Sequence, residues 1–363
     1  MWTEEVVRLV KEKFVPLAVD GRLVNFCDDS EMEFLREPTL CVANGASGSA
    51  WVVSAGGKRL QRGELHHARG VFLRSLEGGL KAFAALPPAE RAPGAVRVPE
   101  RGPIDPRRMA ALSPPSGGLI VRVYNRQLGR TAEGGLRYTV PEDYLPALRD
   151  PAVVGTANAT ALFRQPANDF LWIPRAEWQA LMPAKPRVGQ DVPVPTTLCA
   201  RVFRFHLDPG RGLTESDAFA HVNAGAGRLR LTVEKVTAGE VLLRLDGHAV
   251  LHNPRKHLLG YQSPNVKKHS QSQMALDYQP CLLGYVAYDP AKRVITRFDV
   301  VALGETRGRP VDSNLLGERV GDPNLLGIAF ELVTDPRPAD YISPKGLRAG
   351  GGHYDLPRYL GTK

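Results

Sequence analysis

The sequence predicts an α+β protein in which a smaller α/β region precedes a larger, mainly antiparallel β domain. Three observations support this prediction. Helical and strand-like periodicities alternate over residues 1–90, a proline-rich stretch follows, and short alternating strands separated by turn residues dominate the remainder. The 36 glycines and 30 prolines among 363 residues agree with a chain rich in strands and turns.

The first region should hold helices around a small sheet. Apolar residues at helical spacing, with acidic residues in the first turn, predict an opening helix, and FVPLAV predicts a short buried strand. Ser30 followed by Glu33 predicts a capping box. The expected elements are a helix over 3–14, a strand over 14–19, a helix beginning near residue 30, a strand pair over 51–63 and a helix over 66–86.

Beyond this region, residues 91–116 form a proline-rich stretch that predicts a domain linker. Short alternating runs then predict strands, with one brief helix that a proline ends. Five antiparallel strands in succession from residue 228 favour a sandwich or a partly open barrel. The expected elements are strands over 117–128, 135–140, 160–164 and 169–174, a helix over 175–182, hairpins over 228–251 and 282–305, and a strand over 327–333.

These patterns divide the chain into four parts. We expect an α/β domain over 1–90, a linker over 91–116, a β-rich domain over 117–345 and a C-terminal tail over 346–363. No stretch is long and apolar enough to cross a membrane, and the acidic residues near the N-terminus are unlike a secretion signal. We therefore expect a cytoplasmic protein; the sequence leaves its oligomeric state open.

The formal net charge is +9, and one stretch, residues 247–276, contains no acidic residue. Its basic residues and histidines could attract a nucleic acid. Elsewhere, however, most basic residues alternate with acidic ones, which is atypical of a phosphate-reading face. We therefore interpret the stretch as an insertion between two hairpins, with anion binding as the secondary interpretation and no nucleic-acid partner expected.

The order helix, strand, helix, strand pair, helix over residues 3–86 resembles the second half of a thioredoxin fold, with WVVSAGGKRLQRG as its closing hairpin. The family's CxxC motif would stand before FVPLAVD, but this region reads MWTEEV. Its cis-proline would precede WVVS, where this chain has Gly48, Ser49 and Ala50. The resemblance therefore implies a degenerate thioredoxin-like domain without the redox motif.

The whole chain also resembles uncharacterised bacterial proteins of planctomycete type, in which a degenerate thioredoxin-like domain precedes a β-rich domain. The stretches that carry this resemblance include DFLWIPRAEWQAL, ARVFRFHL and ITRFDVVALGE. It implies the architecture and no particular chemistry.

A lone thiol offers an alternative function. Cys27 could act as a peroxidatic or glutathione-reactive thiol with Cys41 as its resolving partner. The adjacent Asp28 and Asp29 oppose this, because negative charge disfavours a thiolate. The alternative interpretation is that both cysteines are small, buried apolar groups with a structural role only.

Two stretches offer candidate ligand-binding residues. RVFRFHLDPGRG places Arg204, His206 and Arg211 among apolar residues, and such a set could hold a carboxylate or phosphate. TRFDVV places Arg297 and Asp299 on one face of a strand. If the strand lines a barrel, this pair could belong to a ligand site; otherwise both groups are simply paired surface charges.

Metal and cofactor motifs are absent from the sequence. His248, His252, His257 and His269 lack nearby cysteines and acidic residues, so we expect no metal site. No phosphate-binding loop, dinucleotide fingerprint or nucleophile elbow is present, so we expect no cofactor. The sequence favours a non-redox binding or scaffold protein for a small anionic ligand or a partner protein, more consistent with a non-enzyme; the alternative is a thiol oxidoreductase or peroxidase using Cys27.

Overall fold

The computed structural model describes residues 4–17, 23, 26–30, 32–33, 49–64, 70–92, 94, 102–143, 166–207, 219, 222–253, 276–307, 324–348 and 354–362. The chain divides into two compact units. The smaller contains residues 1–109 and 151–160, and the larger contains residues 110–150 and 161–363. The mixture of helices with a large antiparallel sheet confirms the α+β class.

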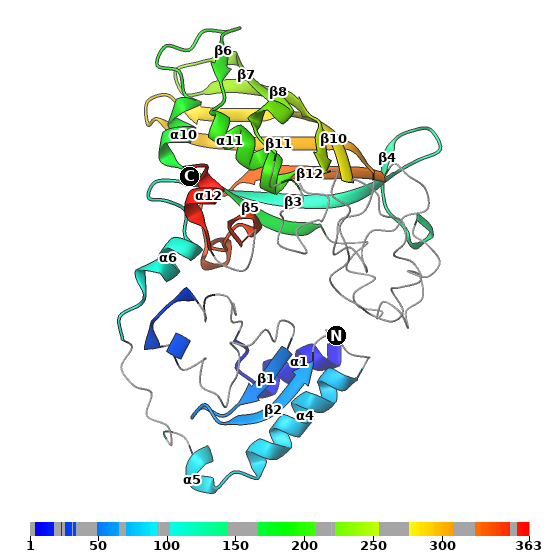
Figure 1. The fold of residues 1–363 in the computed structure, drawn as a ribbon, viewed down its shortest axis with the longest axis vertical. Coiled ribbons are helices and arrows are strands. Elements are labelled where there is room, and N and C mark those ends of the chain that lie inside the picture. Colours follow the sequence, from blue (N-terminus) through cyan, green and yellow to red (C-terminus); the bar gives the residue numbers. More distant parts are fainter. Residues whose placement is uncertain are drawn as a thin grey trace. The chain divides into compact units, whose positions relative to one another are not determined.

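The smaller unit packs helices on an antiparallel hairpin (Figure 1). Its apolar cluster joins Val6, Phe72 and Leu76 to the inner face of the hairpin. Gly79 makes this packing possible, because a Cβ atom there would lie 2.7 Å from the Val52 side chain. The elements are α1 (Glu4–Lys13), β1 (Ser49–Val53), β2 (Arg59–Glu64), α4 (Val71–Ala84) and α5 (Pro88–Arg91).

The strand expected over 14–19 does not form in its described part, residues 14–17. The Phe14 amide donates to the Val10 carbonyl at 3.1 Å, so helical hydrogen bonding continues past α1. Val15 and Leu17 are then 96% and 79% exposed, which a buried strand would not allow. Pro16 has no amide proton for a sheet ladder. The thioredoxin-like order therefore lacks one of its expected elements here.

The capping and linker predictions also need correction. The Met32 amide donates to Asp29 Oδ1 at 3.0 Å, so Asp29 takes the capping role expected of Ser30. Part of the predicted linker is ordered. Asp105 accepts hydrogen bonds from the Asp28 amide and from Arg107, and the short helix α6 (Pro106–Leu112) follows. These contacts hold the start of α6 to the smaller unit.

The larger unit is built on a single sheet, with ten strands among its described residues. The strands run antiparallel in the order β4-β3-β12-β11-β10-β8-β7-β6, while β5 pairs with β3 and β9 with β10. The expected hairpins over 228–251 and 282–305 are present as β7–β8 and β10–β11, and β12 follows as the expected further strand. The strands are β3 (Leu119–Arg130), β4 (Leu136–Tyr138), β5 (Ala167–Ile173), β6 (Asp191–Pro193), β7 (Gly227–Val236), β8 (Val241–Ala249), β9 (Leu251–Asn253), β10 (Leu276–Asp289), β11 (Val294–Arg307) and β12 (Asn324–Leu332).

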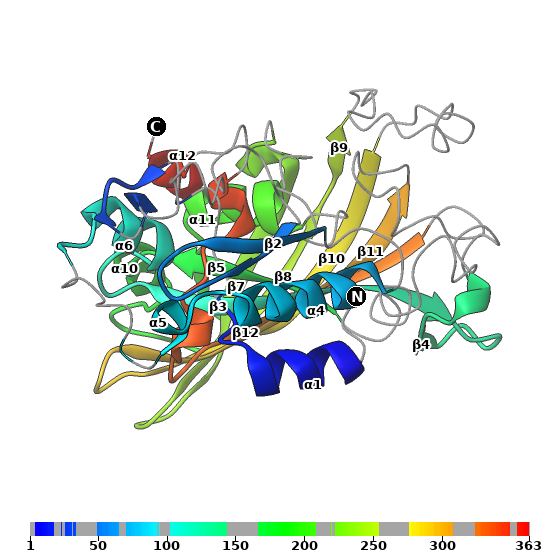
Figure 2. The ribbon, with the colours of Figure 1, turned by 90° about the horizontal axis from the view of Figure 1, so that it is seen from below.

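Helices supply the other half of the core, against one face of this sheet (Figures 1 and 2). Trp178, Leu198 and Phe203 join inward residues such as Leu243 and Val300 in one apolar cluster. The described strands therefore form a single sheet covered by helices, so the expected sandwich of two sheets is wrong. The strand order does not close, and the partly open barrel stays a prediction. The covering elements are α10 (Arg175–Ala180), α11 (Thr196–Arg201) and the π-helix η2 (Val202–His206).

The residues expected to form a C-terminal tail belong to the larger unit. Leu347 and Tyr359 are each 1% exposed, so the segments around these two residues contribute to the core of the larger unit. The remaining short helices of this unit are η1 (Pro141–Asp143), η3 (Ala224–Ala226), η4 (Pro338–Asp340), η5 (Lys345–Arg348) and α12 (Leu356–Leu360). Within the described part of the chain, no helix has the length and apolar character to span a membrane.

Candidate functional site

His206, one of the predicted ligand residues, is the centre of a buried polar chain. Its Nε2 atom lies 2.8 Å from the Tyr359 hydroxyl, which accepts a hydrogen bond from the Trp172 amide at 3.2 Å. Its Nδ1 atom lies 3.3 Å from Asp169 Oδ2, at ion-pair distance but without hydrogen-bond alignment. The Tyr359 hydroxyl can donate to Nε2 while it accepts from Trp172, and the ring proton on Nδ1 then faces Asp169.

Asp169 is ionised in this setting. Burial opposes its charge, but the His206 imidazole and the Lys345 amide, which donates to Oδ1 at 2.9 Å, outweigh burial and lower the pKa of the carboxyl. Burial raises the pKa of Tyr359, so its hydroxyl keeps its proton. The chain is thus one carboxylate, one imidazole and one neutral phenol.

A second buried network adjoins it at Tyr359. Arg201 is fully buried, and its guanidinium bridges both oxygens of Glu177 at 2.7 and 2.8 Å. Its remaining hydrogen bonds go to backbone carbonyls, namely those of Tyr359 at 3.0 Å, Trp172 at 3.2 Å and Leu360 at 3.0 Å. Thr197 also donates to Glu177, at 2.5 Å. All donors of this arginine therefore have partners inside the protein.

Together the two networks close the outer edge of β5 at Trp172. The Trp172 amide and carbonyl have no sheet partner on that side; they bond to Tyr359 and Arg201 instead. An edge strand with open backbone groups would otherwise invite pairing with another chain. Since His206 and Arg201 have no exposed side-chain surface, the networks position backbone and offer no access to a substrate.

The other candidate ligand residues are scattered. Arg204 donates its Nε–H to the backbone carbonyl of Val222, so its guanidinium is engaged in packing η2. Arg211 lies outside the described residues. Arg297 and Asp299 pair with each other at 2.5 Å on β11.

That pair lies on the opposite face of the sheet from His206. Phe298 and Val300 of β11 belong to the core that the helices cover, so the alternating residues Arg297 and Asp299 face away from it. His206 lies within the helical layer. The structure therefore does not bring the five candidate residues into one pocket.

The structure places the candidate thiol Cys27 in an unreactive setting. Its side chain is fully buried. Burial raises the pKa of the thiol, and the charges of Asp105 and Asp29 raise it further. These effects disfavour the thiolate that peroxidatic chemistry needs. The proposed resolving residue, Cys41, lies outside the described residues.

The histidine cluster does not assemble as a metal site among the described residues. His252 pairs with Asp277 at 2.6 Å across β9 and β10, and His248 is exposed on β8. His257 and His269, with most of the acid-free stretch, lie outside the described residues.

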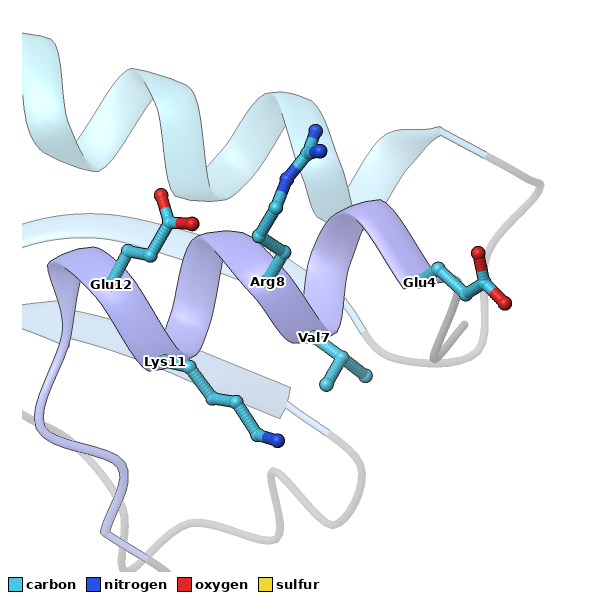
Figure 3. Close-up of a pocket in the computed structure, with 5 residues that line it drawn as sticks. All are labelled: Glu4, Val7, Arg8, Lys11 and Glu12. Atoms are coloured by element: carbon cyan, nitrogen blue, oxygen red, sulfur yellow. The ribbon is translucent and has the colours of Figure 1, made fainter.

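A depression of about 460 Å³ lies along α1 in the smaller unit, lined by Glu4, Val7, Arg8, Lys11 and Glu12. Figure 3 shows these side chains fanning outward along an exposed helix rather than converging.

The face of the large sheet opposite the helices has a different character. Near its centre, Leu283 of β10 and Val301 of β11 pair across the strands, and they are 58% and 51% exposed. Charged residues flank them on both sides, Arg244 and Asp246 on β8 and Glu331 on β12. We call this surface, from β7 to β3, the open face.

Sequence reasoning missed Asp169, Glu177 and Tyr359 because their partners are far away along the chain: His206 and Tyr359 are 153 residues apart. One signal was available. Arg201 and His206 flank the mainly apolar run VFRF, and polar residues inside an apolar segment need buried partners.

No protein-family model matches the chain, and neither the curated proteins nor the solved structures include one significantly similar to it.

Proposed function

We propose that this chain is a binding or scaffold protein without thiol redox chemistry, and that its larger unit binds a protein surface through the open face. The observation that carries this proposal is the exposure of Leu283 and Val301 at the centre of a wide sheet. Single exposed apolar residues are ordinary, but two that pair across neighbouring strands within a charged margin resemble the centre and rim of a protein interface.

The chemistry of the open face sets the kind of partner. Its centre is aliphatic, and its margins carry both arginine and carboxylate groups, so the matching surface is apolar in the middle with charges of both signs around it. A small anion would need several cationic donors directed at one point. The candidates for such a site lie on different faces, which favours the protein partner over the small ligand.

We propose further that the smaller unit is a thioredoxin-like packing or docking module of a cytoplasmic protein. The β1–β2 hairpin followed by α4 supports this relationship, and the exposed coil at residues 15–17 weighs against a complete fold. The buried Cys27 thiol, with its raised pKa, disfavours the oxidoreductase alternative.

The proposed function can be tested by site-specific photo-crosslinking in cells that produce the full chain. A photoreactive amino acid at Val301 should give a discrete crosslinked product, and Leu283→Glu in the same chain should abolish it. Val188, which is 68% exposed in the loop before β6, is the control position. No product from Val301, or equal products from both positions, would refute the proposal.

A further inference from the structure

We infer that the partner of the open face is a second copy of this chain, forming a two-fold symmetric dimer in which two open faces pack against each other. The inference rests on the proposed function, since it names the occupant of the same surface. It is carried by the register of the strands, which in a two-fold arrangement sets apolar residues opposite each other and an arginine opposite a glutamate in two adjacent rows.

Two adjacent rows of residues cross the open face. The first runs from Arg230 on β7 through Asp246, Leu283 and Val301 to Ala329 on β12. The second runs through Arg244 on β8, Tyr285 on β10, Asp299 on β11 and Glu331 on β12. Residues within a row lie directly opposite one another on neighbouring strands, so each row is level along the strand direction.

The charges in these rows are unevenly distributed. Arg230 and Arg244 both pair with Asp246, at 3.4 and 3.7 Å, so two guanidinium groups share one carboxylate on the β7–β8 side. On the β12 side, the Glu331 carboxylate receives the Tyr124 hydroxyl at 3.0 Å, and Arg122, which lies opposite Glu331 on β3, is neutralised by Asp340. Within these two rows, one excess positive charge therefore lies on one side of Leu283 and Val301, and one excess negative charge on the other. The next row along the strands carries Arg228 on β7 and Arg126 on β3.

A two-fold axis parallel to the strands, between β10 and β11, matches these groups. It places β8 of one copy over β12 of the other and keeps each row level. Arg244 then faces Glu331 of the second copy, and Leu283 faces its Val301, each contact occurring twice. A symmetric interface needs this kind of self-complementarity. Twisted sheets pack face to face with their strands about 30° apart, so the axis is only approximately parallel to the strands and the contacts stay level only near it.

The open face is also large enough. From β7 to β3 it spans six strands about 4.8 Å apart, and about eight residues of each strand at roughly 3.4 Å per residue. The face is thus on the order of 800 Å² per copy, the typical contribution of one partner to a stable interface.

A native cysteine provides the first test. Cys281 is exposed on the open face and pairs with Leu303 in the next row along the strands. With sheets packed about 10 Å apart and strands about 4.8 Å apart, the two copies of Cys281 in the dimer would be separated by about 11 Å between Cα atoms. That is too far for a disulfide, which needs about 7 Å or less, but within reach of a short bismaleimide.

We expect the purified full chain to sediment as a dimer and to give a covalent dimer with the bismaleimide, and we expect Cys281→Ser to abolish the crosslink. Val301→Glu should weaken association by at least about a hundredfold, because two uncompensated carboxylates would be buried per dimer. A crosslink that persists without Cys281, or a chain that stays monomeric up to about 100 µM, would overturn the inference.

Charge exchange supplies the second test. Arg244→Glu and Glu331→Arg should each weaken the dimer about tenfold, since each places like charges opposite one another twice. An equimolar mixture of the two variants should restore association, because both pairs between positions 244 and 331 of the heterodimer are then of opposite sign. If each variant still dimerises like the parent, or if mixing restores nothing, the proposed two-fold arrangement is wrong.

The outcome also separates this inference from the function on which it rests. A monomeric chain whose Val301 photo-crosslinks specifically to a different protein refutes self-association and keeps the open face as a binding surface. A chain with neither dimer nor specific crosslink refutes both.

Discussion

Replacing Glu177 with alanine should strongly destabilise the larger unit, because it would leave Arg201 charged and unpaired in the core. The guanidinium is fully buried and Glu177 is its only acidic partner among the described residues, through two hydrogen bonds of 2.7 and 2.8 Å. Removing one partner of a buried ion pair typically costs about 3–5 kcal/mol. For a unit of this size, that corresponds to a fall in Tm of roughly 6–20 °C.

Chemical denaturation followed by tryptophan fluorescence measures this loss, since Trp172 and Trp178 lie in the same unit. The control is Glu240→Ala, which breaks the exposed pair with Lys235 at 3.6 Å and should cost under about 1 kcal/mol. A loss below about 1 kcal/mol for Glu177→Ala would show that water reaches the guanidinium, and the closed β5 edge described above would then be incorrect.

Three further predictions concern other parts of the chain. In α4, Gly79→Ala should destabilise the smaller unit by about 1–3 kcal/mol, because its Cβ would collide with the hairpin. Gly78→Ala, whose Cβ would lie 3.5 Å from its nearest neighbour, should be neutral or stabilising by up to about 1 kcal/mol. Thermal unfolding of both variants tests the packing, and equal effects on the two would contradict it. Because the pKa of Asp169 lies below its ordinary 3.8, the stabilising contribution of this carboxylate is present above that value and is lost as pH falls through the folded pKa. Asp169→Asn should therefore be less stable than the parent at neutral pH, and its unfolding free energy should depend less on pH below about 4. An unchanged slope would refute this. Finally, the exposed Cys281 should react with a thiol reagent well before Cys27 at neutral pH, and fast labelling of Cys27, followed by mass spectrometry of the peptides, would revive the redox alternative.

The strand pattern of the larger unit was predictable because alternation is a local property. Leu231, Val233, Leu243 and Leu245 alternate with polar residues, and the structure places them on the covered face of the β7–β8 hairpin. What covers that face was not predictable. An alternating strand packs equally well against a helix or a second sheet, so the sequence could not separate the observed helical layer from a sandwich or a barrel.

Short apolar runs were the weakest basis for prediction. FVPLAV has the composition of a buried strand, yet Phe14 extends the preceding helix and Pro16 cannot donate a hydrogen bond to a sheet ladder.

The prediction that the candidate ligand residues share one site was wrong because it also rested on local pattern. His206 and Asp299 could be placed on elements from local pattern, but their opposite orientation depends on which face of β11 the helices cover, and that is decided by contacts across the whole unit.

The bonds from α12 to β5 and α11 also bear on how the chain folds. The Tyr359 hydroxyl meets a backbone amide 187 residues earlier, and Arg201 reaches carbonyls 158 and 159 residues later. Contacts so distant in sequence are slow to form, because a long loop must close first. During synthesis, β5 and the arginine must therefore wait until residue 360 has left the ribosome. Until then the growing chain carries an open strand edge beside a cation with no partner, and this interval is when the larger unit is most exposed to pairing with another nascent chain.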